Sequence, residues 1–230
     1  MKSKRVTIAV SETDSVSAIL SVPDRFESAT AIIVAHGAGN DMNNPLLVSF
    51  CEHLAAAGYL AVRFNFPYKE HGRKAPDRPD VLGETWRRVL YFMKDQSGYP
   101  LRKIFAAGKS MGGRVASEML ARGALTSDGV IFLGYPLHPA GKKEKLRDQH
   151  LQHITVPMLF FAGTRDPLCD LYLLKAVVKR LGLRTELEVI EGGDHSFNLP
   201  KSSSLTVTEV YEKIAERSIR WISGHIATKR

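Results

Sequence analysis

The segment Ile104–Gly112 reads Ile-Phe-Ala-Ala-Gly-Lys-Ser-Met-Gly, and it decides the fold. Its first four residues form an apolar run that predicts a buried strand, and the residues after Ser110 have the spacing of a helix. A serine on so sharp a turn, a nucleophile elbow, has a strained backbone and a projecting hydroxyl. The positions two residues before and after it must lack a Cβ, and Gly108 and Gly112 satisfy this requirement. The segment therefore predicts a reactive Ser110.

Two phosphate-binding patterns compete with this interpretation. Gly108–Ser110 is also the end of a phosphate-binding loop, but the first glycine of that loop would stand at position 103, which is Lys103. Gly37–Gly39 resembles the start of a dinucleotide fingerprint, but its third glycine would stand at position 42, which is Met42. The first departure favours the elbow, and the second argues against a dinucleotide-binding loop.

Composition sets outer limits on the class of protein. The chain has 230 residues, of which 44% are apolar, enough for one well-buried core in a single domain over residues 1–230. Its net charge is +8, but the basic residues are spread along the chain without aromatic residues between them. We read the charge mainly as a solubility feature and expect no nucleic-acid partner. The oligomeric state is left open.

Neither a membrane segment nor a metal or disulfide framework is indicated. No stretch approaches the length of an apolar membrane span, and the basic start Met1–Arg5 is followed by too short an apolar run for a signal peptide. The two cysteines, Cys51 and Cys169, lack metal-type spacing and are expected to be buried. We expect a cytoplasmic protein without membrane contact, cofactor or metal.

Apolar runs alternate with segments of helical period along the chain, which predicts an α/β fold. Continuous apolarity is typical of parallel strands covered by helices on both faces. Six strands are expected, most of them continuously apolar, at Ala31–Ala35, Tyr59–Phe64, Ile104–Ala107, Val130–Leu133, Met158–Ala162 and Thr185–Ile190. Two shorter segments, Val6–Val10 and Ser17–Val22, predict an antiparallel pair, which gives a mostly parallel sheet of eight strands.

Glycines mark the expected helix ends. A helix often stops at a residue in the left-handed conformation, which glycine adopts without a steric penalty. Five glycines follow segments of helical period: Gly58, Gly98, Gly123, Gly182 and Gly224.

Two further strand ends carry residues of catalytic type. Asp166 follows the strand expected at Met158–Ala162, and His195 follows the one at Thr185–Ile190. Because functional sites of such sheets form at the carboxyl ends of the strands, we expect both side chains near Ser110. The order Ser, Asp, His predicts a triad in which His195 accepts the serine proton and Asp166 orients the imidazole.

Each member of this triad also has a structural interpretation. Ser110 could cap a helix, Asp166 could cap the helix after Pro167, and His195 could be an ordinary surface residue. Asp194 and Asp170 are the alternative acids.

An oxyanion hole requires two converging backbone donors. One is expected from Met111, the residue after the nucleophile, and the other from Ala38 in the glycine-rich loop that begins at His36. We interpret His36 as an anchor of this loop, and His150 with His153 as a solvated helix face rather than a metal pair.

A polar segment, Pro67–Arg78, is too long for a plain connection and is expected to border the site. Its basic residues Lys69, Arg73, Lys74 and Arg78 would favour anionic substrates, whereas the alternative is a solvated loop with internal ion pairs. Tyr68 and Arg73 in this segment, and Gly37 in the glycine-rich loop, are expected substrate contacts. The connection from Gly134 to Thr155 is too short for a full cap domain, which indicates an open site for small acyl groups.

Six segments carry a family resemblance: His36–Gly39, Arg63–Tyr68, Gly108–Arg114, Gly134–Pro139, Gly163–Asp166 and Gly193–His195. With them the chain resembles the α/β-hydrolase family from about Thr30 onward. It is most similar to the dienelactone-hydrolase-like predicted hydrolases, a group with testis-expressed hydrolase-like proteins and the hydrolase-like domain of a nonspecific-lethal chromatin complex subunit.

The resemblance implies a metal-free serine hydrolase with Ser110, Asp166 and His195 as nucleophile, acid and base. Ser110 stands where true dienelactone hydrolases carry a cysteine, so dienelactone itself is not the expected substrate. We expect a hydrolase of small carboxylic esters or related acyl compounds that forms an acyl-enzyme. The alternative is a catalytically silent hydrolase fold that serves as an interaction module.

Overall fold

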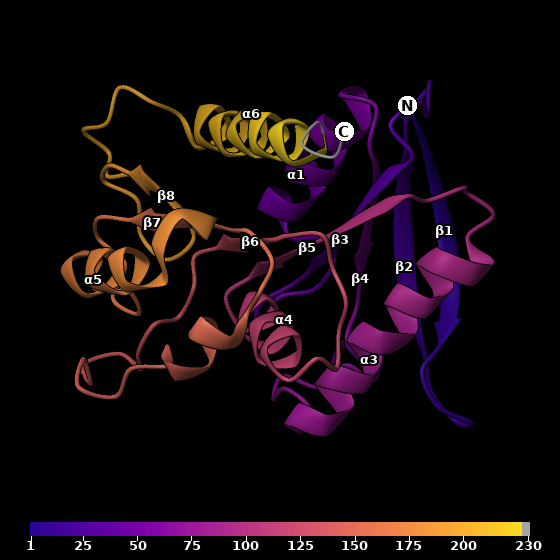
Figure 1. The fold of residues 1–230 in the computed structure, drawn as a ribbon, viewed down its shortest axis with the longest axis horizontal. Helices are drawn as coiled ribbons and strands as arrows, with labels where there is room; N and C mark the ends of the chain where they lie inside the picture. The colour runs from indigo at the N-terminus through magenta and orange to yellow at the C-terminus, as the bar shows by residue number, and fades with distance from the viewer. Residues whose placement is uncertain (227–230) are drawn as a thin grey trace.

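One sheet of eight strands forms the centre of the protein, in the order β1-β2-β4-β3-β5-β6-β7-β8 (Figure 1). The computed structural model describes residues 1–226, so the last four residues of the domain expected over 1–230 lie outside it. The strands are β1 (Lys2–Ala9), β2 (Ser15–Val22), β3 (Thr30–Ala35), β4 (Leu60–Phe64), β5 (Lys103–Lys109), β6 (Val130–Leu133), β7 (Met158–Gly163) and β8 (Thr185–Ile190). The pairs β1–β2 and β2–β4 are antiparallel and the others are parallel, which confirms the expected mostly parallel sheet.

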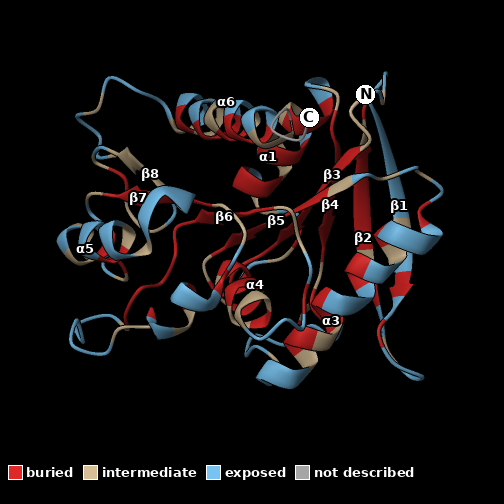
Figure 2. Ribbon diagram, in the orientation of Figure 1, coloured by how far each residue is buried: buried red, intermediate tan, exposed pale blue. Residues whose placement is uncertain are grey.

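Two layers of helices cover the sheet. The elements are α1 (Pro45–Ala56), α2 (Pro67–Glu70), α3 (Pro79–Tyr91), α4 (Met111–Ala121), α5 (Leu171–Leu181) and α6 (Val207–Ile226), with a π turn η1 (Phe92–Gln96) and 3-10 turns η2 (Gln149–His153) and η3 (Gly182–Arg184). Helices α1 and α6 pack on one face, whereas α3, α4 and α5 pack on the other (Figure 1). The central strands are therefore buried on both faces, as their continuous apolar sequences predict (Figure 2).

Four of the five glycines expected to end helices adopt the left-handed conformation. Gly58, Gly98, Gly123 and Gly182 have φ values of 89°, 79°, 66° and 77°. The expectation for Gly224 is wrong, because α6 continues through it to Ile226. A glycine inside a helix weakens it by roughly 1 kcal/mol, a cost that the tertiary packing of α6 offsets.

The carboxyl ends of the parallel strands lie at one edge of the sheet, and the polar segment after β4 follows this edge. That segment contains the short helix α2, which was not expected from the sequence. In the connection after β6, residues 134–157, the 3-10 turn η2 is the only helical element and Gly141–Lys145 are exposed, so no cap domain covers this edge. Within residues 1–226, no helix combines the length and apolarity needed to cross a bilayer.

Candidate active site

Ser110 lies on the strained turn between β5 and α4. Its φ of 50° and ψ of −115° belong to neither strand nor helix, and such a conformation is rare for a residue with a side chain. A Cβ on Gly108 would lie 2.2 Å from the Gly113 nitrogen, and one on Gly112 would lie 2.6 Å from the His36 oxygen. The turn therefore requires glycine at both positions, as the sequence predicts.

A chain of hydrogen bonds joins Ser110, His195 and Asp166. Nδ1 of His195 is 2.7 Å from Oδ2 of Asp166, and Nε2 is 2.8 Å from Oγ of Ser110. Because an ionised carboxylate only accepts, Nδ1 carries the proton and donates it to Asp166. Nε2 is then the acceptor for the serine hydroxyl, which is the orientation that a general base requires.

Asp166 is committed to this contact, and the alternative acids have other partners. Its second oxygen, Oδ1, accepts from the backbone of Leu168 over 2.8 Å, and its side chain is fully buried. Asp170, rather than Asp166, caps α5, since it accepts from two amides of the first turn. Asp194 accepts from the backbone amides of Ser196 and Asn198 and so holds its own loop together.

The hydrogen bonds around these two acids are reflected in their pKa values. The Lys143 ammonium and the helix amides lower the pKa of Asp170. Burial acts to raise the pKa of Asp194, but the bonds from Asn198 and Ser196 leave it below the ordinary value. Both side chains therefore remain ionised in structural roles.

His36 anchors the loop after β3, as expected. Its ring is fully buried, its Nε2 accepts from the Phe66 amide over 3.1 Å, and its Nδ1 donates to the Gly37 carbonyl over 2.8 Å. Burial lowers the pKa of His36 to about 4, so the neutral ring is the form at physiological pH.

The anchored loop runs beside Ser110 and presents a free donor. A Cβ on Gly37 would lie 3.2 Å from Cβ of Ser110, so the main chain passes next to the nucleophile. The amide of Met111 is the first of α4 and directly follows Ser110 in the chain. Within residues 1–226, neither the Ala38 nor the Met111 amide donates a backbone hydrogen bond outside helices and strands, so both are available to an oxyanion.

The other expected contact residues, Tyr68 and Arg73, lie in and just after the short helix α2. Tyr68 is fully buried and its hydroxyl donates to the Gly37 carbonyl over 3.4 Å, so it holds the loop after β3 in place. Arg73 is exposed and forms an ion pair with Asp77, whose other oxygen accepts from the Tyr68 amide. Arg78 pairs with Asp80. This segment thus has the internal ion pairs of the alternative interpretation.

A close crossing of two backbones, which the sequence analysis missed, brings Asp166 and His195 together. A Cβ on Gly163, at the end of β7, would lie 2.1 Å from the Gly193 oxygen. The Arg165 amide then donates to that same oxygen over 2.9 Å. The glycines before each acid and base residue were the available signal, since two backbones can approach this closely only without side chains.

Lys109 is a second residue that sequence reasoning missed. It lies inside the elbow motif, is buried, and donates from Nζ to the main-chain carbonyl of His195 over 2.6 Å. The sequence signal was the position itself, directly before the nucleophile and after the apolar run Ile104–Ala107.

The remaining histidines and the cysteines have structural surroundings. His153 is exposed, but the expectation of a solvated face is wrong for His150, which is half-buried and lies 2.8 Å from Oγ of Ser117 on α4. Cys51 and Cys169 are both buried, as expected. Within residues 1–226, no three His, Cys, Asp or Glu side chains cluster as a metal site would require.

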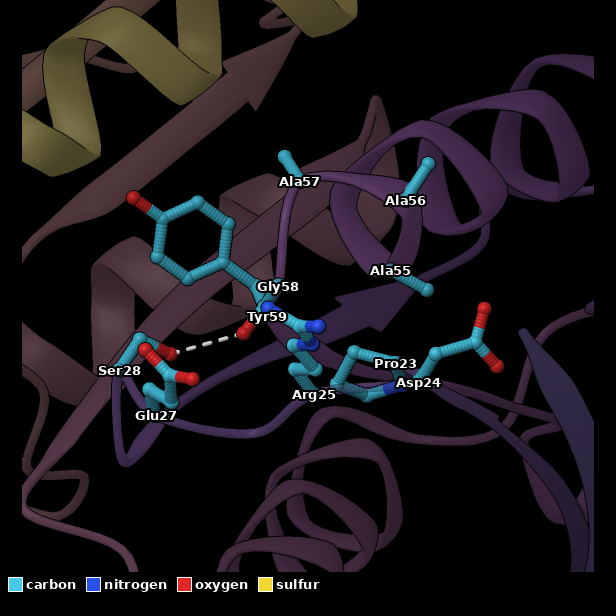
Figure 3. Close-up of a pocket in the computed structure, with 10 residues that line it drawn as sticks. All are labelled: Pro23, Asp24, Arg25, Glu27, Ser28, Ala55, Ala56, Ala57, Gly58 and Tyr59. Carbon is cyan, nitrogen blue, oxygen red and sulfur yellow. Dashed lines mark hydrogen bonds between the residues drawn. The ribbon is translucent and has the colours of Figure 1, made fainter.

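A concavity of about 520 Å³ lies elsewhere on the molecule (Figure 3). It is lined by Pro23–Arg25, Glu27, Ser28 and Ala55–Tyr59, at the amino ends of β3 and β4. Because the triad lies at the opposite ends of the strands, this concavity is separate from the candidate site.

An α/β sheet that presents serine, aspartate and histidine in this chain order at the carboxyl ends of its strands has the arrangement of the α/β hydrolases. The sequence agrees. Residues 28–223 match the α/β hydrolase domain family, and the chain therefore belongs to it.

Several solved structures share the fold over nearly its whole length. An α/β serine hydrolase homologue from Coxiella burnetii is 18% identical, with 96% of this chain and 98% of that chain covered and a TM-score of 0.75. An α/β serine hydrolase without a lid from Xanthomonas campestris is 21% identical, with 96% and 95% covered and a TM-score of 0.74. A dienelactone hydrolase from Anabaena variabilis is 19% identical, with 97% of both chains covered and a TM-score of 0.75.

Proposed function

We propose that the protein is a serine hydrolase that cleaves carboxylic esters or related acyl bonds of small substrates. The observation that carries this proposal is the hydrogen-bonded chain from Ser110 through His195 to Asp166. Acyl transfer needs these two hydrogen bonds, a serine on a strained turn, and backbone amides that have no other hydrogen-bond partner within residues 1–226.

In the proposed reaction, Oγ of Ser110 attacks the acyl carbon while its proton passes to Nε2 of His195. The carbonyl electron pair moves onto oxygen, where the amides of Ala38 and Met111 stabilise the negative charge. When the pair returns, the bond to the leaving alkoxide breaks and His195 gives that oxygen the proton. Water then repeats the sequence on the acyl-enzyme and releases the acid.

Gly37 and Tyr68 support this step through the loop that carries Ala38. The Gly37 carbonyl accepts from His36 and Tyr68, and these two bonds fix the orientation of the peptide whose N–H belongs to Ala38. Burial raises the pKa of Tyr68 to about 12, which keeps its hydroxyl a donor.

The proposed substrates are small, and anions are favoured among them. The imidazole of His195 is 19% exposed and no cap domain covers the edge of the sheet, so the acyl group has little enclosing wall. Within the described residues, Lys74 is exposed and has no ion pair, unlike Arg73 and Arg78. Its charge remains available to attract a carboxylate-bearing ester, and this attraction should weaken as salt rises.

Two finer assignments belong to the same proposal. We place the chain in the dienelactone-hydrolase-like group, with the testis-expressed proteins and the nonspecific-lethal complex subunit, on the strength of its six motif segments. We keep the cytoplasm as its compartment, which two buried free cysteines suit.

Treatment with a fluorophosphonate probe followed by intact-mass measurement tests the function. The wild type should gain one adduct as the serine oxygen displaces fluoride from phosphorus, and Ser110→Ala should gain none. Ser117→Ala is the matched control, because Ser117 also contacts a histidine but is fully buried and lies outside the triad. It should label like the wild type.

The same experiment separates the enzyme from a silent interaction module. A silent module would leave the wild type unlabelled, and equal labelling of Ser110→Ala would move the nucleophile to another residue.

A further inference from the structure

The side chain of Lys109 is a buried cation without a counter-ion. Only 4% of the residue is exposed, and within residues 1–226 no carboxylate lies within ion-pair distance of it. Its Nζ donates instead to the main-chain carbonyl of His195 over 2.6 Å. A buried ammonium held by neutral partners is costly, so stability alone does not account for a lysine at this position.

The carbonyl that Lys109 binds belongs to the least regular part of the site. Residues 191–206 connect β8 to α6 without helix or strand. Phe197 in this segment has a φ of 64° and is fully buried, with its ring centroid 6.0 Å from Nζ of Lys109. The end of β5 and this segment are therefore joined through one ammonium group.

Gly134, directly after β6, completes the contact. A Cβ at this position would lie 3.0 Å from the His195 oxygen, 3.3 Å from Nζ of Lys109 and 3.7 Å from Cε1 of the imidazole. Absence of a side chain here lets the lysine, the carbonyl and the ring lie together.

We infer that Lys109 is a positioning residue that fixes the backbone of His195 and so sets the imidazole against Ser110. The inference rests on the proposed triad. The two hydrogen bonds of the imidazole orient the ring, but they do not fix the Cα from which it projects. The bond from Lys109 supplies that second constraint, and it starts from the residue next to the nucleophile. A displacement of the base by about 1 Å lowers turnover by about a hundredfold.

The charge of Lys109 also acts on the imidazole. Burial lowers the pKa of Lys109 to about 8, while the charges of Asp166 and Asp194 act to raise it, so the ammonium form predominates at neutral pH. The Gly134 contacts place the ammonium and the imidazole within about 7 Å of each other. A cation at this distance repels a positive charge on the ring.

Lys109→Met tests the inference, since methionine keeps the length of the side chain but lacks both the donor and the charge. We expect kcat to fall about 10- to 100-fold with little change in KM. The acidic limb of the kcat/KM profile should move up by about half a pH unit to one unit. Lys109→Arg keeps the charge, so its acidic limb should stay at the wild-type position.

Lys103→Met is the matched control, because Lys103 begins the same strand and pairs with Asp128 away from the site. Its kcat and its pH profile should match the wild type. A ¹⁵N NMR titration of the imidazole should show the same upward displacement in Lys109→Met without any substrate. This test of Lys109 is therefore independent of the proposed function, and it can be read even if the wild type fails to hydrolyse esters.

Two results would overturn the inference. One is Lys109→Met with wild-type kcat and an unmoved acidic limb. The other is a Lys109→Met protein that no longer folds, because removal of an unpaired buried charge should leave the melting temperature equal or higher.

Discussion

Asp166 divides its carboxylate between His195 and the backbone of Leu168, so the oxygen that faces the imidazole is fixed in place. In Asp166→Asn the amide can turn its nitrogen toward Nδ1 of His195, and Nδ1 then accepts a hydrogen bond. The ring proton moves to Nε2, which can no longer accept the proton of Ser110. We expect kcat to fall by about 10⁴ with the fold intact. The measurement is steady-state hydrolysis of a short ester beside a circular dichroism melt.

Asp170→Asn is the control for this substitution, because asparagine caps a helix as well as aspartate does. Helix α5 and turnover should both survive it. Unchanged turnover in Asp166→Asn would instead transfer the role of the acid to another carboxylate.

His36 makes the stability of the protein depend on pH. Its pKa in the folded state is lowered to about 4, below the unfolded value near 6.5, because the ring is buried and its Nε2 accepts from Phe66. Between these two pKa values the unfolded chain binds more protons than the folded one. The contribution of His36 to the free energy of unfolding is therefore present above pH 6.5 and is lost as the pH falls toward 4. The loss at pH 4.5 is on the order of 2 to 3 kcal/mol.

Urea unfolding at pH 7.0 and pH 4.5 measures this contribution. His36→Gln keeps an acceptor for the Phe66 amide but cannot be protonated. It should therefore lose about 2 to 3 kcal/mol less than the wild type between the two pH values. The same pH dependence in both proteins would assign the effect to other groups.

At the scale of elements, the crossing of the β7 end with the segment after β8 couples the acid to the base. Gly163→Ala places a Cβ 2.1 Å from the Gly193 oxygen, and only backbone displacement relieves the contact. Because this displacement separates Asp166 from His195, we expect kcat to fall about a hundredfold. Initial rates measure the fall in kcat, and a thermal melt measures the effect of the backbone displacement on stability.

Gly141→Ala separates this effect from backbone strain. Gly141 has a φ of 70°, but nothing lies within 4 Å of the place where its Cβ would be. This variant should lose about 1 kcal/mol of stability and keep its turnover. If Gly163→Ala keeps its turnover as well, the crossing does not control the site.

The sequence predicted the elements whose signal is local. The five buried strands β3 to β7 show as apolar runs, and the elbow shows as two glycines at the positions where a Cβ would clash. Strand β1, whose first residues are polar and exposed, was predicted too short, because an edge strand with a solvated face has no continuous apolar run. Helix α2 has one turn, too few residues for a period to appear.

The part of the site that could not be predicted depends on contacts between distant residues. Lys109 and His195 are 86 positions apart, and nothing in either local sequence records that one side chain binds the other main chain. His150 likewise looked solvated because its partner, Ser117, lies on a helix 33 residues earlier. Buried polar partners of this kind become visible only when the packing of the elements is known.

At the scale of the whole molecule, the absence of a cap domain between β6 and β7 predicts a preference for short acyl chains. Each methylene enclosed by apolar walls contributes about 0.8 kcal/mol, or about a fourfold rise in kcat/KM. At an uncovered edge of the sheet, the added methylenes stay in water and contribute little. We therefore expect kcat/KM to be highest for acetyl and butyryl esters of p-nitrophenol and no higher for octanoyl. Rates are measured below the micelle concentration, with Ser110→Ala for background hydrolysis. A rise of about two hundredfold from butyryl to octanoyl, which four enclosed methylenes would give, would reveal an apolar channel and contradict the open site.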